Sequence, residues 1–234
     1  MKQNVQAGVK VYEYSREAGD FHAENIRIEN GTIVFDMVSP IENVTNIELG
    51  QPVPINIENG IAAMALAQLS GCTAEELRRG MKTYEGVDRR FDFKIKNDQH
   101  VLLSDYAHHP KEILQSAKSL KEIYSNRKIT VIFQPHLYSR TRDFYMDFAE
   151  ALSHFDEVIL TEIYPAREEP IPGVTSELIY NNLDNKVERQ MIKKDDVLEF
   201  ANDRDFDVLV VLGAGNLDNY MRQLSEIIKE KEQN

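Results

Sequence analysis

The sequence predicts an α/β protein made of two parts that meet near Gly86. After Gly86, short apolar segments alternate with segments whose apolar residues recur at helical spacing, which is typical of a mostly parallel sheet with helical crossovers. The segment at residues 208–212 is almost entirely apolar, as expected of a strand covered on both faces. Before Gly86, antiparallel strands are followed by helices. We therefore expect a Rossmann-like sheet flanked by helices, preceded by a smaller segment of strands and helices.

The first part shows a hairpin, a third strand and two helices. Asn30-Gly31 is the strongest short hairpin signal and separates two β-rich segments. Thr73 and Glu76 have the spacing of a capping box at the start of the second helix. We predict strands at residues 25–28, 32–38 and 44–49 and helices at residues 58–69 and from 74 to about 84.

The second part begins with a second hairpin and then alternates helices with strands. Pro110 predicts the start of the first of its helices, because proline is favoured in a first helical turn. Strands are predicted at residues 91–95, 100–104, 129–133, 157–161 and 208–212, and helices at 111–123, 142–152, 175–180, 195–200 and 216–229.

Composition excludes several classes of function. The net charge is -12 and the pI is about 5.0, so nucleic acid and anionic membrane are not the expected partners. No apolar run reaches the roughly 20 residues that span a bilayer, and the first residues do not form a secretion signal. The single Cys72 excludes an internal disulfide and a cysteine-built zinc site. These features predict a cytoplasmic protein.

One polar string, Ser104-Asp105-Tyr106-Ala107-His108-His109-Pro110, stands where a strand runs into a helix. Open α/β sheets bind their ligands at the carboxyl ends of their strands, where such a string would lie. A carboxylate at Asp105 can accept bonds from ribose hydroxyls or hold hydrated magnesium. Adjacent histidines in a turn point in different directions, so we predict no transition-metal site. A simple turn or helix cap is the alternative explanation for Asp105.

A second string, Phe133-Gln134-Pro135-His136-Leu137-Tyr138-Ser139-Arg140-Thr141-Arg142, follows the next predicted strand. Free N–H groups at a helix N-terminus, together with the guanidinium groups of Arg140 and Arg142, predict a receptor for carboxylate or phosphate. The alternative is that these arginines pair with surface acids such as Asp143 or Glu150.

Each of three further segments allows two interpretations. Asn56 and Asn59 open a helix, where their carboxamides can read adenine or cap the helix. The Arg89-Arg90 pair stands at the junction of the two parts, where Arg90 can stabilise phosphoryl charge on closure or be simply solvated. Gly213-Ala214-Gly215-Asn216 follows a buried strand, but Asp218 occupies the third glycine position of a dinucleotide fingerprint, so a tight turn is the favoured explanation.

These segments, together with Glu168-Glu169-Pro170-Ile171-Pro172-Gly173, resemble the Mur ligases in the family's order, and specifically the branch that adds L-alanine to UDP-N-acetylmuramate. The resemblance implies that residues 88–234 form the C-terminal Mur ligase domain. It also implies that residues 1–87 are the end of a central ATP-binding domain. No window matches the Gly-x-x-x-x-Gly-Lys-Ser/Thr phosphate loop, so we expect an incomplete enzyme whose Met1 is not the natural start.

The resemblance also assigns roles to residues. The implied catalytic residues are Asp105, His108 and Arg90; the implied substrate-binding residues are Tyr106, His136, Arg140 and Arg142; the implied nucleotide-binding residues are Asn56, Asn59, Arg90 and Asp105. Three positions depart from the family pattern, which usually has a second acid at Ser104, an arginine at Leu137 and a histidine at Ile55.

The implied reaction is amide-bond formation. ATP with Mg²⁺ would phosphorylate the carboxylate of UDP-N-acetylmuramate, and L-alanine would attack the acyl phosphate. We expect this chain alone to be inactive. The alternatives are a fragment of the ligase that recycles UDP-N-acetylmuramate with a tripeptide, a non-catalytic nucleotide-binding module, or a partner-binding domain.

Overall fold

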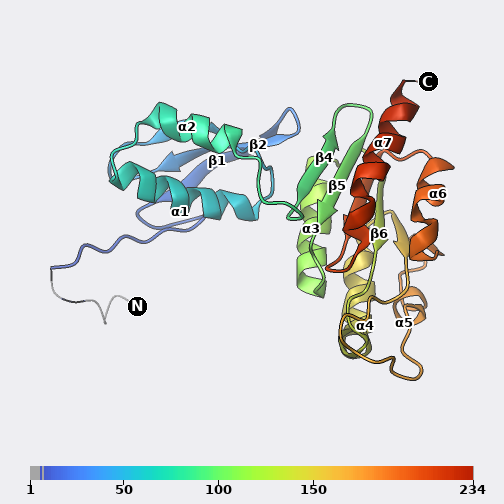
Figure 1. Cartoon of the computed structure of the whole chain (residues 1–234). Coiled ribbons are helices and arrows are strands. Elements are labelled where there is room, and N and C mark those ends of the chain that lie inside the picture. Colours follow the sequence, from blue (N-terminus) through green and yellow to red (C-terminus); the bar gives the residue numbers. More distant parts are fainter. Residues whose placement is uncertain (1–5, 7, 234) are drawn as a thin grey trace. The chain divides into compact units, whose positions relative to one another are not determined.

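The computed structural model describes Gln6 and residues 8–233 (Figure 1). The chain divides into two compact units, Met1–Gly86 and Val87–Asn234.

The first unit is built on a three-stranded antiparallel sheet in the order β1 (His22–Glu29), β2 (Thr32–Val38), β3 (Val44–Glu48). Asn30 and Gly31 both have positive φ, 51° and 71°, which is what a tight two-residue hairpin turn between twisted strands requires. The predicted hairpin is therefore confirmed, and β1 begins three residues before the predicted strand.

Two helices, α1 (Ile55–Leu69) and α2 (Ala74–Thr83), complete this unit. Thr73 accepts a bond from the Glu76 amide and Glu76 accepts one from the Thr73 amide, which confirms the predicted capping box. The helices cover the sheet with apolar side chains. The buried core of the unit includes Phe21, Phe35, Met37, Ile47, Ile57, Ile61, Met64 and Leu77.

The second unit contains a six-stranded sheet in the order β4-β5-β9-β6-β7-β8. Its strands are β4 (Asp92–Lys96), β5 (Val101–Asp105), β6 (Ile129–Phe133), β7 (Glu157–Leu160), β8 (Glu188–Met191) and β9 (Val208–Leu212). Only the β4–β5 pairing is antiparallel. The mostly parallel α/β fold predicted from the alternation of segments is thus confirmed. The last strand in the chain, β9, lies between β5 and β6.

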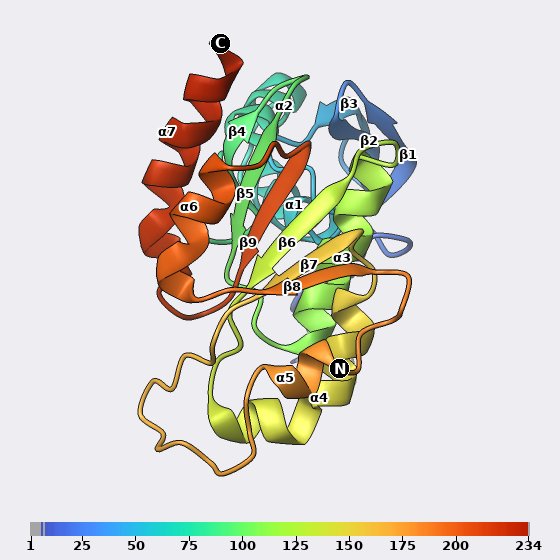
Figure 2. The same cartoon turned by 90° about the vertical axis from the view of Figure 1, so that its right-hand side faces the viewer.

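Helices cover both faces of this sheet (Figure 2). One face carries α3 (Pro110–Ile123), α4 (Tyr138–Leu152) and α5 (Glu177–Tyr180), and the other carries α6 (Val197–Asn202) and α7 (Met221–Glu232). Short 3₁₀ turns, η2 (Lys194–Asp196) and η3 (Leu217–Tyr220), precede α6 and α7. All five residues of β9 are buried, as a strand covered on both sides must be.

The structure differs from the prediction at one strand and at the starts of several helices; α1 begins at Ile55 rather than Glu58, and α7 at Met221 rather than Asn216. Strand β8 was not predicted, because its sequence Glu-Arg-Gln-Met is polar and it occupies the edge of the sheet, where one side remains solvated. Helix α4 begins at Tyr138, four residues before the predicted start at Arg142, and has a kink at Phe144. In the described part of the chain, no helix has the length and apolar character needed to cross a membrane.

Candidate functional site

The carboxyl ends of β5, β9 and β6 lie side by side, so the loops that follow them meet at one edge of the sheet. The loop after β9 approaches Gln134 so closely that a Cβ at Gly213 would lie 2.8 Å from the Gln134 carbonyl oxygen. A Cβ at Gly215 would lie 2.1 Å from Gln134 Oε1, which accepts a hydrogen bond from the Asn216 amide. These glycines are therefore required for close packing between loops, in agreement with the tight-turn interpretation.

Asp105 ends β5, and its carboxylate is engaged within the chain. Ser116 Oγ on α3 donates to one oxygen and the Phe91 amide donates to the other at 3.3 Å. The Ala107 amide also donates to this side chain, which makes the turn after the strand. Burial raises the pKa of Asp105, and these three hydrogen bonds lower it only in part. A carboxylate has about four acceptor positions, so one remains for a ligand.

The next residues extend along the edge as a row of rings. The Tyr106 and His108 rings meet edge to face at 5.1 Å between centroids, and His108 meets His136 in the same way at 6.0 Å. The Glu112 carboxylate accepts bonds from the His108 and His109 amides, at 3.0 and 3.1 Å, and so fixes the start of α3. Residues from two loops that are separated in the sheet by β9 are thereby brought together.

His136 and Arg140 carry the strongest chemical signal at this edge. Among the described residues, neither His136 Nδ1 nor Arg140 Nη1 has a hydrogen-bond partner, although both atoms are buried. Burial lowers the pKa of His136 from 6.5, and the charges of Arg140 and His108 lower it further. Buried polar groups are almost always satisfied, so these two nitrogens are available to a bound water or ligand.

The N-terminus of α4 does not provide the free anion receptor that the sequence predicted. Glu168 accepts a hydrogen bond from the Ser139 amide at 2.9 Å and another from Ser139 Oγ. The chain's own carboxylate therefore already binds the Ser139 amide in the first turn of the helix. Leu137, at the position where the family pattern has arginine, adopts φ 73° as the residue before α4. The candidate anion site is reduced to His136 and the Arg140 side chain.

Arg142 is not brought into this group. Its Nε pairs with Asp143 Oδ1 at 2.8 Å, and both side chains are about half exposed. This contact is the surface pair that was the alternative explanation for Arg142.

At the start of the second unit, the contacts belong to Arg89 rather than to Arg90. The Arg89 guanidinium lies 4.8 Å above the Tyr106 ring and donates to the carbonyl oxygens of Gly213 and Gly215. The Arg90 side chain is exposed and has no ion pair or hydrogen bond to any residue that the structure describes. The resemblance to the family favoured Arg90 and assigned no role to Arg89. Local sequence does not distinguish the two arginines, so the contacts of Arg89 were not predicted.

Asp218 supplies a carboxylate near the position where the family pattern has a second acid. Ser104 Oγ donates to Asp218 Oδ1 at 2.9 Å, and Arg89 Nε lies 3.4 Å from Asp218 Oδ2. The sequence could not indicate this contact, because Asp218 comes from η3, more than 100 residues along the chain.

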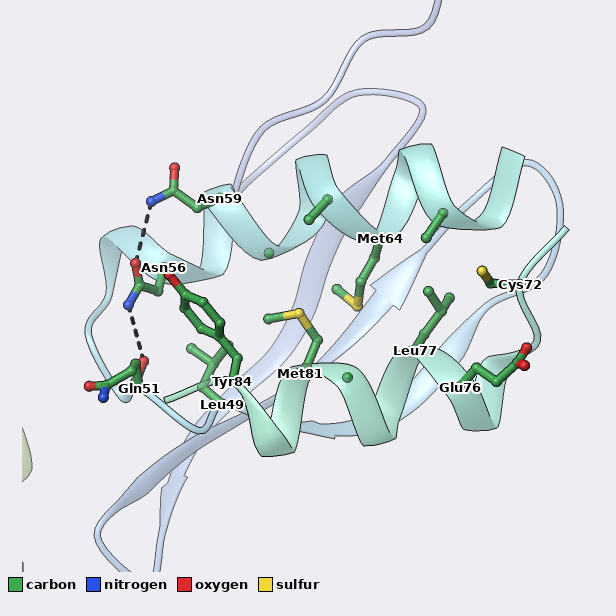
Figure 3. Close-up of a pocket in the computed structure, with 14 residues that line it drawn as sticks. Leu49, Gln51, Asn56, Asn59, Met64, Cys72, Glu76, Leu77, Met81 and Tyr84 are labelled. Atoms are coloured by element: carbon green, nitrogen blue, oxygen red, sulfur yellow. Dashed lines mark hydrogen bonds between the residues drawn. The ribbon is translucent and has the colours of Figure 1, made fainter. Parts of the chain in front are cut away.

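In the first unit, Asn56 and Asn59 lie at one end of a groove between α1 and α2 (Figure 3). The groove has a volume of about 490 Å³ and is lined mainly by apolar residues, among them Met64, Leu77 and Met81. Asn56 Nδ2 donates to the Gln51 carbonyl at 3.3 Å, and Asn59 Nδ2 donates to Asn56 Oδ1. Neither carboxamide caps α1, whose first residue is preceded by Pro54. Among the described residues, no side chain or amide donates a hydrogen bond to Asn59 Oδ1.

Comparison with known proteins shows close relatives. The chain is 62% identical to the UDP-N-acetylmuramate--L-alanine ligase of Phocaeicola vulgatus over 97% of its own length and 50% of that protein. It is 52% identical to the same-named protein of Parabacteroides distasonis, over 96% of the chain and 48% of the relative. The chain thus spans about half the length of these curated relatives.

Solved structures share the fold. The crystal structure of UDP-N-acetylmuramate-alanine ligase from Thermotoga maritima matches with a TM-score of 0.74 and 24% identity, covering 94% of this chain and 48% of that one. Folylpolyglutamate synthase from the same organism matches with a TM-score of 0.67 at 18% identity, over 88% and 47% of the two chains. The model of the family described as "Mur ligase, glutamate ligase domain" matches residues 89–229. That match covers more than half of the chain, which therefore belongs to the Mur ligase family.

Proposed function

We propose that this chain is part of an ATP-dependent ligase that joins L-alanine to UDP-N-acetylmuramate through an acyl phosphate, a step of peptidoglycan synthesis. The proposal is supported by the identity to two proteins of that name, at 62% and 52%. In this proposal, residues 1–87 belong to the central ATP-binding domain and residues 88–234 form the C-terminal domain.

The observation that carries the proposal is the pair of buried, unsatisfied nitrogens on His136 and Arg140. A guanidinium is well suited to bind a carboxylate, and a neutral imidazole can exchange a proton with an amine. An amino acid has both groups, so its carboxylate would bind Arg140 and its amine would lie toward His136 and His108. The lowered pKa of His136 keeps its ring neutral near pH 7, as this arrangement needs.

ATP and Mg²⁺ are the proposed cofactors. ATP would supply the phosphoryl group and Mg²⁺ would neutralise the phosphate charge. The proposed contacts from this chain are the Asn56 and Asn59 carboxamides to the base, the one remaining acceptor position of Asp105 to the nucleotide, and the exposed Arg90 to the phosphates. Within the described residues, no three His, Cys, Asp or Glu side chains gather as metal ligands.

The relatives' names favour this reading over the tripeptide-recycling ligase. A non-catalytic nucleotide-binding module remains a separate hypothesis, supported if the chain binds ATP tightly without catalysing phosphate release. A phosphate-release assay with ATP, UDP-N-acetylmuramate and L-alanine is expected to show no turnover by these 234 residues. Turnover by the chain alone would contradict the expectation that it is only part of the enzyme.

The amino-acid site is tested by NMR titration of the chain with L-alanine. We expect chemical-shift changes at His108 and His136, and a loss of binding of about tenfold or more in Arg140→Ala, the size expected for a lost charge-assisted hydrogen bond. Arg167→Ala is the matched control, because it removes the same charge from an exposed position. Equal losses in both variants would show that Arg140 acts only through net charge.

A further inference from the structure

The loop that follows β7 returns to the connection between β6 and α4 at two points. At the first, the Tyr164 amide donates to the Pro135 carbonyl at 2.8 Å and the Leu137 amide donates to the Tyr164 carbonyl at 2.9 Å. The Tyr164 ring is stacked on the His136 ring, with centroids 5.6 Å apart and planes inclined by 25°. At the second point, Glu168 binds the amide and the hydroxyl of Ser139.

The two points are joined by a short, constrained turn. The Glu168 amide donates to the Pro165 carbonyl at 2.9 Å, and Ala166 between them has φ 52°. Proline restricts the backbone further. Tyr164 and Glu168 therefore hold a fixed spacing, and each is attached to a different position in the segment that carries His136 and Arg140.

His136 itself lacks the hydrogen bond that usually orients a functional histidine. Its Nδ1 has no partner among the described residues, so the ring plane is held by its two ring contacts, with Tyr164 and His108. The stacked contact fixes the plane of the ring, whereas the edge contact with His108 limits its tilt. A residue that fixes Tyr164 consequently also fixes the direction in which His136 Nδ1 points.

We propose that Tyr164 and Glu168 form a clamp that positions His136, with Glu168 anchoring the loop to Ser139 and Tyr164 orienting the imidazole. Both are positioning residues, since no contact of theirs with a ligand is invoked. The identity of the ligand rests on the proposed function, but the geometry of the clamp does not.

Hydrogen exchange and NMR of the histidine rings test the clamp in the 234-residue chain. In Glu168→Ala, exchange of the Ser139 amide should accelerate about tenfold, the effect of losing a helix cap. Exchange of the Leu137 amide should also accelerate, and the ring signals of His136 should shift. Glu168→Gln should retain the slow exchange of the Ser139 and Leu137 amides, because its single side-chain oxygen still accepts from the Ser139 amide and its NH₂ group can donate to Ser139 Oγ in place of the second accepted bond. Glu169→Ala is the control, since Glu169 is an exposed neighbour on the same loop.

Tyr164 is tested by a second pair of variants. Tyr164→Phe keeps the stacked ring and should keep the His136 signals, whereas Tyr164→Ala should shift them. If Glu168→Ala accelerates exchange only at Ser139 and leaves Leu137 and His136 unchanged, Glu168 is a local helix cap and the proposal is overturned. Unchanged His136 signals in Tyr164→Ala would overturn it as well.

A titration with L-alanine separates this proposal from the proposed function. Where the native chain binds L-alanine, Glu168→Ala should weaken binding about tenfold and Glu168→Gln should leave it near native, in proportion to the lost cap. If the native chain does not bind L-alanine, the result argues against the proposed ligand. The clamp is still tested in that case by the His136 ring signals of the variants.

Discussion

Replacing Arg89 by alanine, with Arg90→Ala as the comparison, tests whether the first residues of the second unit are tied to the candidate site. The two arginines are adjacent and chemically identical, but their surroundings differ. Arg89 contacts the Tyr106 ring, the Gly213 and Gly215 carbonyls and Asp218, whereas Arg90 is exposed. A difference between the variants therefore reports these contacts and not the loss of a charge.

The size of the effect follows from the geometry. The two hydrogen bonds to carbonyl oxygens are long, at 3.4 and 3.2 Å, so each should contribute about 0.5–1 kcal/mol, near the lower end for intramolecular bonds. The cation–π contact adds about 0.5–1 kcal/mol. The ion pair with Asp218 has both side chains 31% exposed and adds little. We expect Arg89→Ala to lower the free energy of unfolding by about 2 kcal/mol, and Arg90→Ala to change it by no more than about 0.5 kcal/mol.

Urea unfolding followed by circular dichroism measures the overall loss, and hydrogen exchange of the Tyr106 amide measures the local one. That amide donates to the Arg89 carbonyl at 2.6 Å, so it reports whether this backbone segment stays in place when the side chain is removed. Equal losses of stability in the two variants would refute the reasoning. A double variant with Asp218→Asn should show less than additive loss, because the residues are in contact.

Three further predictions concern buried groups. Asp105→Asn should remove the part of the pH dependence of stability that comes from the raised pKa of Asp105. Because burial disfavours the charged carboxylate, urea unfolding should show the native chain gaining stability relative to the variant as the pH falls and the carboxyl takes up a proton. Parallel pH profiles of the two chains would contradict this. Tyr124→Phe should stabilise the chain by about 1 kcal/mol in thermal unfolding, because the buried Tyr124 hydroxyl has no hydrogen-bond partner among the described residues. Destabilisation would show that the hydroxyl has a partner. His136 should titrate by NMR below its usual pKa of 6.5. The unfolded chain then takes up the proton at a higher pH than the folded chain does, so the free energy of unfolding should decrease as the pH falls below that value. His136→Gln should lack this part of the pH dependence.

Much of the fold follows from local sequence patterns. Asn30-Gly31 specifies its hairpin through two positive φ angles, and the capping box at Thr73 and Glu76 marks the start of α2. The apolar segments at 129–133 and 208–212 coincide with β6 and β9. Strand β8 escaped prediction because its stability comes from pairing with β7 at the sheet edge and not from its own composition.

The candidate site was predicted less completely. The two polar strings located Asp105, His108, His136 and Arg140, since strand ends in parallel sheets are recognisable from sequence. The loop that contains their partners was matched to the family pattern, but no contact or role was predicted for it. Glu168 and Tyr164 come from the loop after β7 and carry no local signal of the segment that they contact.

The sequence by itself determined most of the secondary structure, the α/β class and the polar residues placed at the strand ends, because each depends on chemistry within a few neighbouring residues. Only the tertiary structure decided which of these residues meet. The insertion of β9 between β5 and β6 sets the separation of the two polar loops. Contacts between distant parts of the chain then place Glu168 at the N-terminus of α4 and Arg89 over the Tyr106 ring. Such pairings depend on the packing of elements distant in the chain, and local sequence does not specify them.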